Sequence, residues 1–236
     1  MAEVCDEARA VNTREVVGYA TLLHLPTLSA LVQKSYLDVE QLLGMAEKAR
    51  WHQCATSKRR LEFLGGRLAA KVADRVARGR GSSPRFVWSD VQILSDPDGR
   101  PYRELRDGSR AQVTISHSGA WVIAVVGSAS RTLAVDLEDA KLTRIGREHL
   151  HPLEQFQIRT TEDARLRWCV KEACAKFSGV GIQGYELDIV VLGFEGRLWV
   201  GLNRSHWLFG SAILAASHLP CFALALMVSE EVSRII

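Results

Sequence analysis

Residues 121–127, with the sequence WVIAVVG, present apolar side chains on both faces of an extended chain. A strand of this kind is covered on both sides, which predicts a central position in a sheet. The segments 113–116 (VTIS) and 132–138 (TLAVDLE) predict two further strands, and apolar residues alternate in the second. The middle of the chain therefore predicts a β-sheet.

A helix is expected from residue 56 to residue 80, because apolar residues recur there at steps of three and four. A second stripe of the same helix is basic. A basic stripe is most often a solvated face, and the alternative is a surface for anionic groups. The predicted apolar stripe is Leu61, Leu64, Leu68, Val72 and Val76, and the predicted basic stripe is Arg60, Arg67, Lys71 and Arg78.

The segment 167–182, RWCVKEACAKFSGVGI, predicts a second amphipathic helix, with Gly179 placed to end it in a left-handed conformation. Glu172 and Lys176 are four positions apart and share a face, so a surface ion pair alone could explain them. The residues expected in the buried stripe are Leu166, Cys169, Val170, Ala173 and Phe177.

The two ends of the chain are less informative. The first forty residues predict mixed strand and loop. Residues 208–228 are largely apolar, but Ser217, His218 and Pro220 interrupt them, so we expect two buried strands joined by a turn and not a membrane span.

The composition limits the function classes. With 236 residues and a net charge of +3, the chain is long enough for a sizeable core and does not demand a nucleic-acid partner. Its five cysteines are odd in number and form no C-x-x-C motif, which favours a reducing cytosol over a disulfide framework or a zinc site. We expect a cytoplasmic protein that binds neither membrane nor nucleic acid.

Two segments of the chain resemble each other. ISHSGAWVIAVV (115–126) and ASHLPCFALALM (216–227) share Ser-His, an aromatic residue and an alanine at the same offsets. A match at four positions can arise by chance. If it is real, the chain consists of two similar halves, each with a strand entered through Ser-His.

Three carboxylates suggest a site for a divalent cation. Asp136 and Glu138 lie on the same face of their predicted strand, although exposed acids are common at strand ends. With Glu172 they would offer the hard oxygen ligands that suit Mg²⁺, and neighbouring lysines would neutralise phosphate groups. Ser116 and His117 at the end of a neighbouring strand fit a phosphate contact better than a Ser-His hydrolase.

Several short motifs follow one another in a fixed order along the chain. GRPY (99–102), ISHSG (115–119), AVDLE (134–138) and W-x-x-KEA-x-x-K-x-x-G-x-G (168–181) follow KRRLEFLGGRLAAK (58–71). In this order they resemble the Sfp-type 4′-phosphopantetheinyl transferases. Ala134 departs from the family's usual glycine.

The resemblance implies an α+β fold, built as a pseudo-dimer of two similar α+β halves with the active site in the cleft between them. Here the halves would be residues 1–127, with coenzyme A-binding elements, and 128–236, with the metal-binding acids and the KEA helix. It implies a monomer with internal pseudo-twofold symmetry. It also implies transfer of the phosphopantetheine arm of coenzyme A to a serine of an apo acyl, peptidyl or aryl carrier protein, with release of 3′,5′-ADP.

The resemblance also implies residue roles. Asp136, Glu138 and Glu172 match the metal ligands for Mg²⁺, Glu172 matches the general base, and Lys176 matches a lysine near the scissile phosphate. Glu154 is an alternative base. A catalytically inactive relative that only binds coenzyme A or a carrier is the alternative function. The residues that match coenzyme A contacts are Lys58, Arg100, Ser116, His117 and Lys171.

Overall fold

The computed structural model describes residues 18–79, 87–127, 132–141, 145–179, 182–183, 186–194, 197–202, 213–219 and 222–228. The chain divides into two compact units, one holding the described residues up to Gly127 and the other those from Thr132 onward. Each unit combines helices with antiparallel strands, so the fold is α+β.

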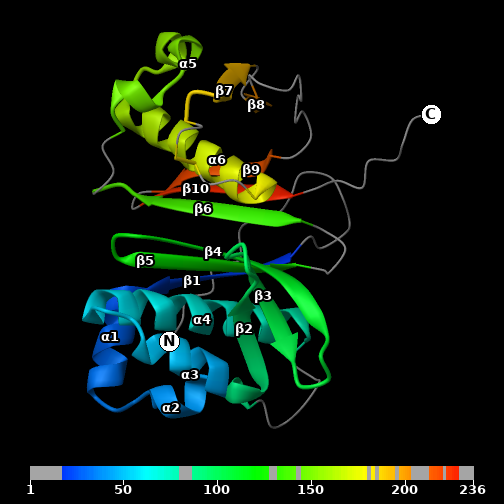
Figure 1. Cartoon of the computed structure of the whole chain (residues 1–236). Coiled ribbons are helices and arrows are strands. Elements are labelled where there is room, and N and C mark those ends of the chain that lie inside the picture. The colour runs from blue at the N-terminus through cyan, green and yellow to red at the C-terminus, as the bar shows by residue number, and fades with distance from the viewer. Residues whose placement is uncertain are drawn as a thin grey trace, which may run out of the picture. The chain divides into compact units, whose positions relative to one another are not determined.

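The first unit is a five-stranded antiparallel sheet with order β1-β5-β4-β3-β2, and α4 lies along it (Figure 1). Strand β5 lies between β1 and β4, which confirms the central strand predicted for residues 121–127. The elements of this unit are β1 (Gly18–His24), α1 (Leu25–Gln33), α2 (Val39–Leu42), α3 (Met45–His52), α4 (Ser57–Ala77), η1 (Trp88–Asp90), β2 (Val91–Ser95), β3 (Pro101–Leu105), β4 (Arg110–Ser118) and β5 (Trp121–Gly127).

The second unit has a three-stranded sheet with order β6-β10-β9 and a β7-β8 hairpin. Helix α6 packs on the three-stranded sheet, and α5 lies near β7 (Figure 1). The elements of this unit are β6 (Leu133–Asp139), η2 (Arg147–His149), α5 (Pro152–Gln157), α6 (Thr161–Ser178), β7 (Ile189–Phe194), β8 (Arg197–Leu202), β9 (Ile213–Leu219) and β10 (Phe222–Val228).

The two units repeat the same order of elements. In each, a first strand is followed by short helices (α1 to α3 in the first unit, η2 and α5 in the second), a long helix, a hairpin and two more strands, and the first strand pairs with the last. The Ser-His echo takes part in this repeat: His117 pairs with Val122, and His218 pairs with Ala223 in the same register.

Helix α4 lies close to its sheet because small residues line the contact. Thr56 caps its first turn by accepting a hydrogen bond from the Arg59 backbone. A methyl group added at Gly66 would lie 3.0 Å from Ile115 of β4, and one at Gly65 would lie 3.1 Å from Val122 of β5. The buried residues of α4 are Leu64, Gly65, Gly66, Ala69, Ala70, Lys71, Ala73 and Asp74.

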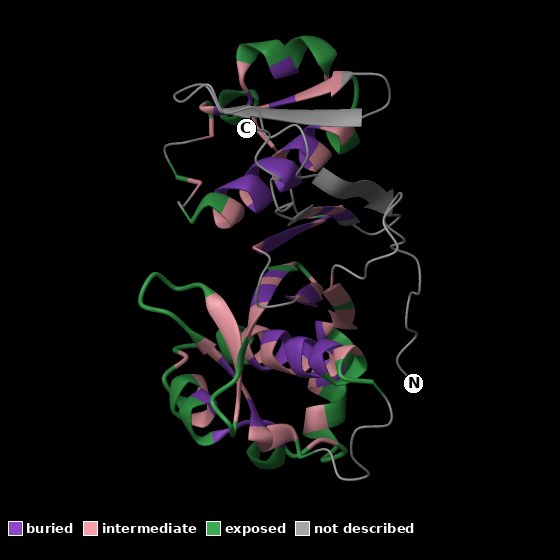
Figure 2. Cartoon of the chain, turned by 90° about the vertical axis from the view of Figure 1, so that its right-hand side faces the viewer, coloured by how far each residue is buried: buried purple, intermediate pink, exposed green. Residues whose placement is uncertain are grey.

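The predicted helix 56–80 is thus confirmed, but its predicted faces are partly wrong. Val76 is exposed, and Lys71, expected on the basic stripe, is fully buried. The alanines and glycines turn a different side of the helix to the sheet, because they permit a closer approach than the leucine stripe would. Figure 2 shows the buried residues concentrated on this helix and on α6.

Of the remaining secondary-structure predictions, those for the strands are confirmed and that for the N-terminal segment is partly wrong. The strands expected at 113–116, 132–138 and within 208–228 are present. The N-terminal prediction of strand and loop was wrong for residues 25–33 and 39–42, which form α1 and α2. Pro26 lies in the first turn of α1, and Asp38 caps α2. Among the described residues no helix has the length and apolar character required to cross a membrane.

Candidate metal and phosphate site

The acidic site begins with strand β6, where Ala134, Asp136 and Glu138 lie on one face. Ala134 packs against Cys169, Val170 and Ala173 of α6 within one buried cluster, so this face of the strand lies under the helix. Asp136 is 1% exposed as a result, whereas Glu138 further along the strand is half-buried.

Helix α6 supplies the other charged side chains. Thr160 caps it by accepting from the backbone of Asp163, and Gly179 ends it with φ 77°, the left-handed conformation predicted from the sequence. The predicted buried residues Cys169, Val170 and Ala173 face the core. Their position leaves Glu172 and Lys176, one turn apart, on the flank of the helix beside β6.

The three acids predicted to bind metal converge. Asp136, Glu138 and Glu172 each offer a carboxylate oxygen, and these oxygens all lie within 4.8 Å of one another. Lys176 joins them: its Nζ donates to Oδ1 of Asp136 at 2.5 Å and to the carbonyl of Val135 at 3.4 Å. Strand β6, which ends at Asp139, and helix α6, which begins at Thr161, therefore build one charged cluster.

The electrostatics of this cluster favour an added cation. Burial and, to a lesser extent, the nearby carboxylate of Asp136 together raise the pKa of Glu172 to about 7, against the opposing effect of Lys176. Burial lowers the pKa of Lys176, but Asp136 and Glu172 outweigh that effect and raise it above its usual value. Three acids facing one ammonium leave an excess of negative charge, and an all-oxygen ligand set suits Mg²⁺.

The first unit has no such cluster at the matching positions. The paired registers of β1 with β5 and of β6 with β10 place Thr21 where Asp136 stands, and Leu23 where Glu138 stands. If α4 and α6 are matched at their fully buried lysines, Lys71 and Lys171, then Val72 and Val76 occupy the places of Glu172 and Lys176. The acids therefore belong to the second unit's chemistry and are not required by the shared architecture.

Two of the residues predicted to contact coenzyme A lie in one surface group of the first unit. His117 Nε2 lies 3.1 Å from Nη1 of Arg59, and Lys58 Nζ lies 3.7 Å from Glu62. Glu62 also pairs with Arg59 at 3.4 Å and lies 3.9 Å from His117. Arg59 and Glu62 were not singled out from the sequence, although their spacing on the helix places them on the face that carries Lys58.

The other predicted contacts are placed differently. Ser116 precedes His117 on β4 and is buried. Arg100 follows the turn between β2 and β3, where it pairs with Asp98 at 3.3 Å on the surface.

Lys171 has a different environment from the one its motif implies. Its side chain is fully buried, and its Nζ lies 2.6 Å from Oε2 of Glu154, which is also fully buried. The ammonium also donates to the carbonyls of Glu186 at 2.6 Å and His149 at 3.2 Å. Lys171 and the alternative base Glu154 thus satisfy each other inside the second unit and present no atoms to a bound substrate.

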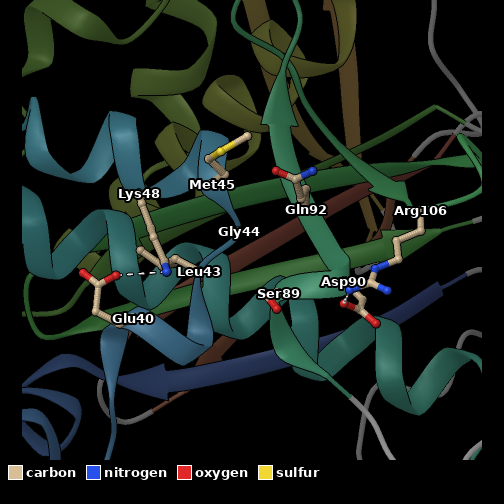
Figure 3. Close-up of a pocket in the computed structure, with 9 residues that line it drawn as sticks. All are labelled: Glu40, Leu43, Gly44, Met45, Lys48, Ser89, Asp90, Gln92 and Arg106. Carbon is tan, nitrogen blue, oxygen red and sulfur yellow. Dashed lines mark ion pairs between the residues drawn. The ribbon is translucent and has the colours of Figure 1, made fainter.

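A separate pocket of about 490 Å³ lies in the first unit between α2–α3 and the start of β2 (Figure 3). It contains none of the predicted site residues. Its charges compensate one another, because Lys48 pairs with Glu40 at 2.9 Å and Arg106 pairs with Asp90 at 2.6 Å. This pocket therefore lacks the excess charge that characterises the cluster on β6 and α6.

The geometry can be compared with known proteins. No family model matches the chain. The holo-[acyl-carrier-protein] synthase of Halalkalibacterium halodurans is 33% identical over 105 residues, which cover 44% of this chain and 87% of that protein. The holo-[acyl-carrier-protein] synthase of Geobacillus kaustophilus is 34% identical over 106 residues, covering 44% of this chain and 81% of that protein.

Solved structures give the same name. A holo-(acyl-carrier-protein) synthase from Bacillus anthracis in complex with CoA (3′,5′-ADP) aligns with a TM-score of 0.41 and 26% identity, over 48% of this chain and 96% of that one. The sequence relatives carry the assignment, because the alignments span more than four-fifths of their length at about one-third identity. This chain belongs to the holo-[acyl-carrier-protein] synthase family of phosphopantetheinyl transferases.

Proposed function

We propose that this protein transfers the 4′-phosphopantetheine arm of coenzyme A to a serine of an apo carrier protein in an Mg²⁺-dependent reaction. The observation that carries the proposal is the convergence of Asp136, Glu138 and Glu172 within 4.8 Å, beside Lys176. Membership of a family whose curated relatives are holo-[acyl-carrier-protein] synthases supports the substrate class.

The reaction needs three things that these residues can supply. The serine hydroxyl must lose its proton, and we assign its acceptance to the carboxylate of Glu172, which lies beside Asp136 and Glu138. The serine oxygen then bonds to the phosphorus that carries the arm. The phosphoanhydride bond to 3′,5′-ADP breaks, and its electron pair leaves with the ADP phosphate.

The developing charge on the phosphates needs neutralisation. Lys176, held against Asp136, places an ammonium group beside the acids for this purpose. Asp136, Glu138 and Glu172 would hold the magnesium ion, which when bound supplies positive charge to the diphosphate. The chain's own task is to hold these side chains in a fixed arrangement with the serine and the phosphate.

Coenzyme A recognition is proposed for the first unit. Lys58 and His117, with Arg59 between them, form a surface group of cationic and hydrogen-bonding side chains suited to phosphate. Ser116 and Arg100 are further proposed contacts. Lys171 is omitted, because its ammonium is enclosed by Glu154 and two carbonyl groups.

The division of these residues between the units implies an arrangement of the whole. We propose that residues 1–127 and 128–236 associate as a pseudo-dimer with the active site in the cleft between them, as in Sfp-type enzymes. The repeated element order supports this arrangement. Because one chain supplies both halves, we propose that the protein is a monomer. We further propose that it is cytoplasmic and that it serves acyl, peptidyl or aryl carriers.

The deciding experiment is a transfer assay. Purified protein is incubated with coenzyme A, Mg²⁺ and each of several apo carriers, and the intact mass of the carrier is measured. We expect a mass gain of one phosphopantetheine that EDTA abolishes and excess Mg²⁺ restores. If no carrier in the panel gains mass while coenzyme A still binds, the protein is a binding relative without transferase activity.

A further inference from the structure

The buried pair of Glu154 and Lys171 has an exact counterpart in the first unit. Lys71 Nζ lies 2.6 Å from Oε2 of Glu47, and both side chains are fully buried. Lys71 also donates to the carbonyls of Leu42 at 2.7 Å and Trp88 at 3.0 Å. Each lysine thus sits at the matching place of its long helix and is enclosed by one carboxylate and two backbone carbonyls.

The two glutamates repeat each other equally closely. Glu47 accepts from the backbone N–H of Gly44 at 2.8 Å, at the start of α3, and from Ile93 in β2 at 3.0 Å. Glu154 accepts from His151 at 2.7 Å, at the start of α5, and from Val191 in β7 at 2.7 Å. In each unit one carboxylate therefore joins a short helix, a strand and the long helix.

This repetition indicates that the buried ion pair has a structural role and takes no direct part in the reaction. The first unit keeps the pair although its matching acid positions hold Thr21, Leu23 and Val72. A general base would not be needed in a unit that lacks these acids. Burial of both partners and the use of their hydrogen-bonding capacity on backbone groups point to the same conclusion.

The pair also lies where it can control the catalytic helix. Lys171 directly precedes Glu172, so the two side chains leave α6 about 100° apart. Small side chains such as Ala173, Ala223 and Ala225 make up part of the buried contact between α6 and its sheet. Hydrogen bonds from Lys171 to Glu154 are directional, so they add a constraint on the orientation of the helix to the one that packing supplies.

We propose that Glu154 is a positioning residue: through Lys171 it fixes the rotation of α6, so that Glu172 and Lys176 meet Asp136. A helix rotation of about 20° would move a carboxylate some 6 Å from the axis by roughly 2 Å. Mg²⁺ requires near-ideal ligand geometry, and a displacement of about 1 Å can reduce a rate by roughly 10²-fold.

The test rests on the proposed transferase activity and uses the repeat as its matched control. Glu154→Gln and Lys171→Met are compared with Glu47→Gln and Lys71→Met by transfer assay over a range of Mg²⁺ concentrations. Each transfer rate is divided by the fraction of the protein that circular dichroism shows to be folded at the assay temperature. If the wild type transfers no arm, the proposed function fails and the variants are not informative about it.

With an active wild type, we expect the second-unit variants to lose about 10–100-fold in apparent Mg²⁺ affinity and in kcat, with the KM for coenzyme A nearly unchanged. The first-unit variants should lower thermal stability without changing the Mg²⁺ dependence. Glu154→Asp, which keeps the charge, should recover part of the loss.

Two results would overturn the proposal. Equal Mg²⁺ dependence in the variants of both units would make the pair merely structural. A rate loss in Glu154→Gln that is absent in Lys171→Met, with unchanged Mg²⁺ affinity, would instead make Glu154 the general base. A double variant, Glu154→Gln with Lys171→Met, adds a check. If the two residues act only through their ion pair, the double variant should lose little more activity than either single variant.

Discussion

The ammonium of Lys176 lies 2.5 Å from the carboxylate of Asp136, a residue forty positions earlier in the chain, and the two meet beneath the edge of α6. Asp136 is almost fully buried at this contact. Three acids and one ammonium group leave a net negative charge around this buried carboxylate. That charge favours the binding of a divalent cation.

Removal of this carboxylate gives the first prediction. Asp136→Asn keeps the side-chain shape but removes a ligand charge, and Asp136→Ala removes the side chain; both should abolish Mg²⁺-dependent transfer in the carrier mass assay. Thr21→Ala, at the matching position of the first unit, should retain transfer. Full activity of a folded Asp136→Ala protein would refute the assignment of the metal site.

Glu172 gives the second prediction, which concerns the base. Glu172→Gln should lower kcat by roughly 10²–10⁴-fold, because the amide cannot accept the serine proton. The loss should persist at saturating Mg²⁺ if proton transfer, and not metal affinity alone, is impaired. A rate that returns to the wild-type value at high Mg²⁺ would assign Glu172 to metal binding only.

How far the sequence anticipates this site depends on the range of the interactions. Strand alternation placed Asp136 and Glu138 on one face, and helical spacing joined Glu172 to Lys176, because both patterns are local. The convergence of strand and helix at one point is long-range: the chemistry of the three acids suggested a shared cation site, and the family resemblance matched them to known metal ligands.

The failures have the same explanation. Lys71 and Lys171 look like surface residues in any local pattern, because lysine is seldom fully buried without a partner. Their partners Glu47 and Glu154 lie 24 and 17 positions away, on short helices that carry no distinctive sequence signal. The buried pairs could therefore not be identified without the fold, and Lys71 was assigned to the basic stripe of α4 for this reason.

Acidity provides a third prediction. In the metal-free protein burial and Asp136 raise the pKa of Glu172 to about 7, so below that pH a proton occupies the site that Mg²⁺ needs. Apparent Mg²⁺ affinity should therefore rise by up to about tenfold per pH unit below pH 7 and level off above it.

The direction of the Glu172 pKa shift can be checked independently from the pH dependence of folding stability. A carboxyl group whose pKa is higher in the folded protein than in the unfolded chain holds a proton that the unfolded chain has released. Without metal, stability should consequently fall as pH rises from about 4.5 to 7, and Mg²⁺ should reverse the loss. Glu172→Gln should flatten both profiles, and calorimetric titrations at several pH values would measure the first. A Mg²⁺ affinity that does not change between pH 5.5 and 7 would contradict this view of the site.

The last prediction concerns coenzyme A. The Lys58 side chain is 83% exposed and its pairing with Glu62 is loose, so Lys58→Ala should leave folding stability nearly unchanged. If the ammonium contacts a phosphate, its loss should raise the KM for coenzyme A by roughly tenfold, the size of one charge-assisted hydrogen bond, and change kcat much less. Lys34→Ala, another exposed lysine of the first unit, is the matched control and should leave KM unchanged. Initial rates at varied coenzyme A concentrations separate the two parameters. If Lys58→Ala lowers kcat and spares KM, coenzyme A is not held at the surface group of Lys58, Arg59 and His117.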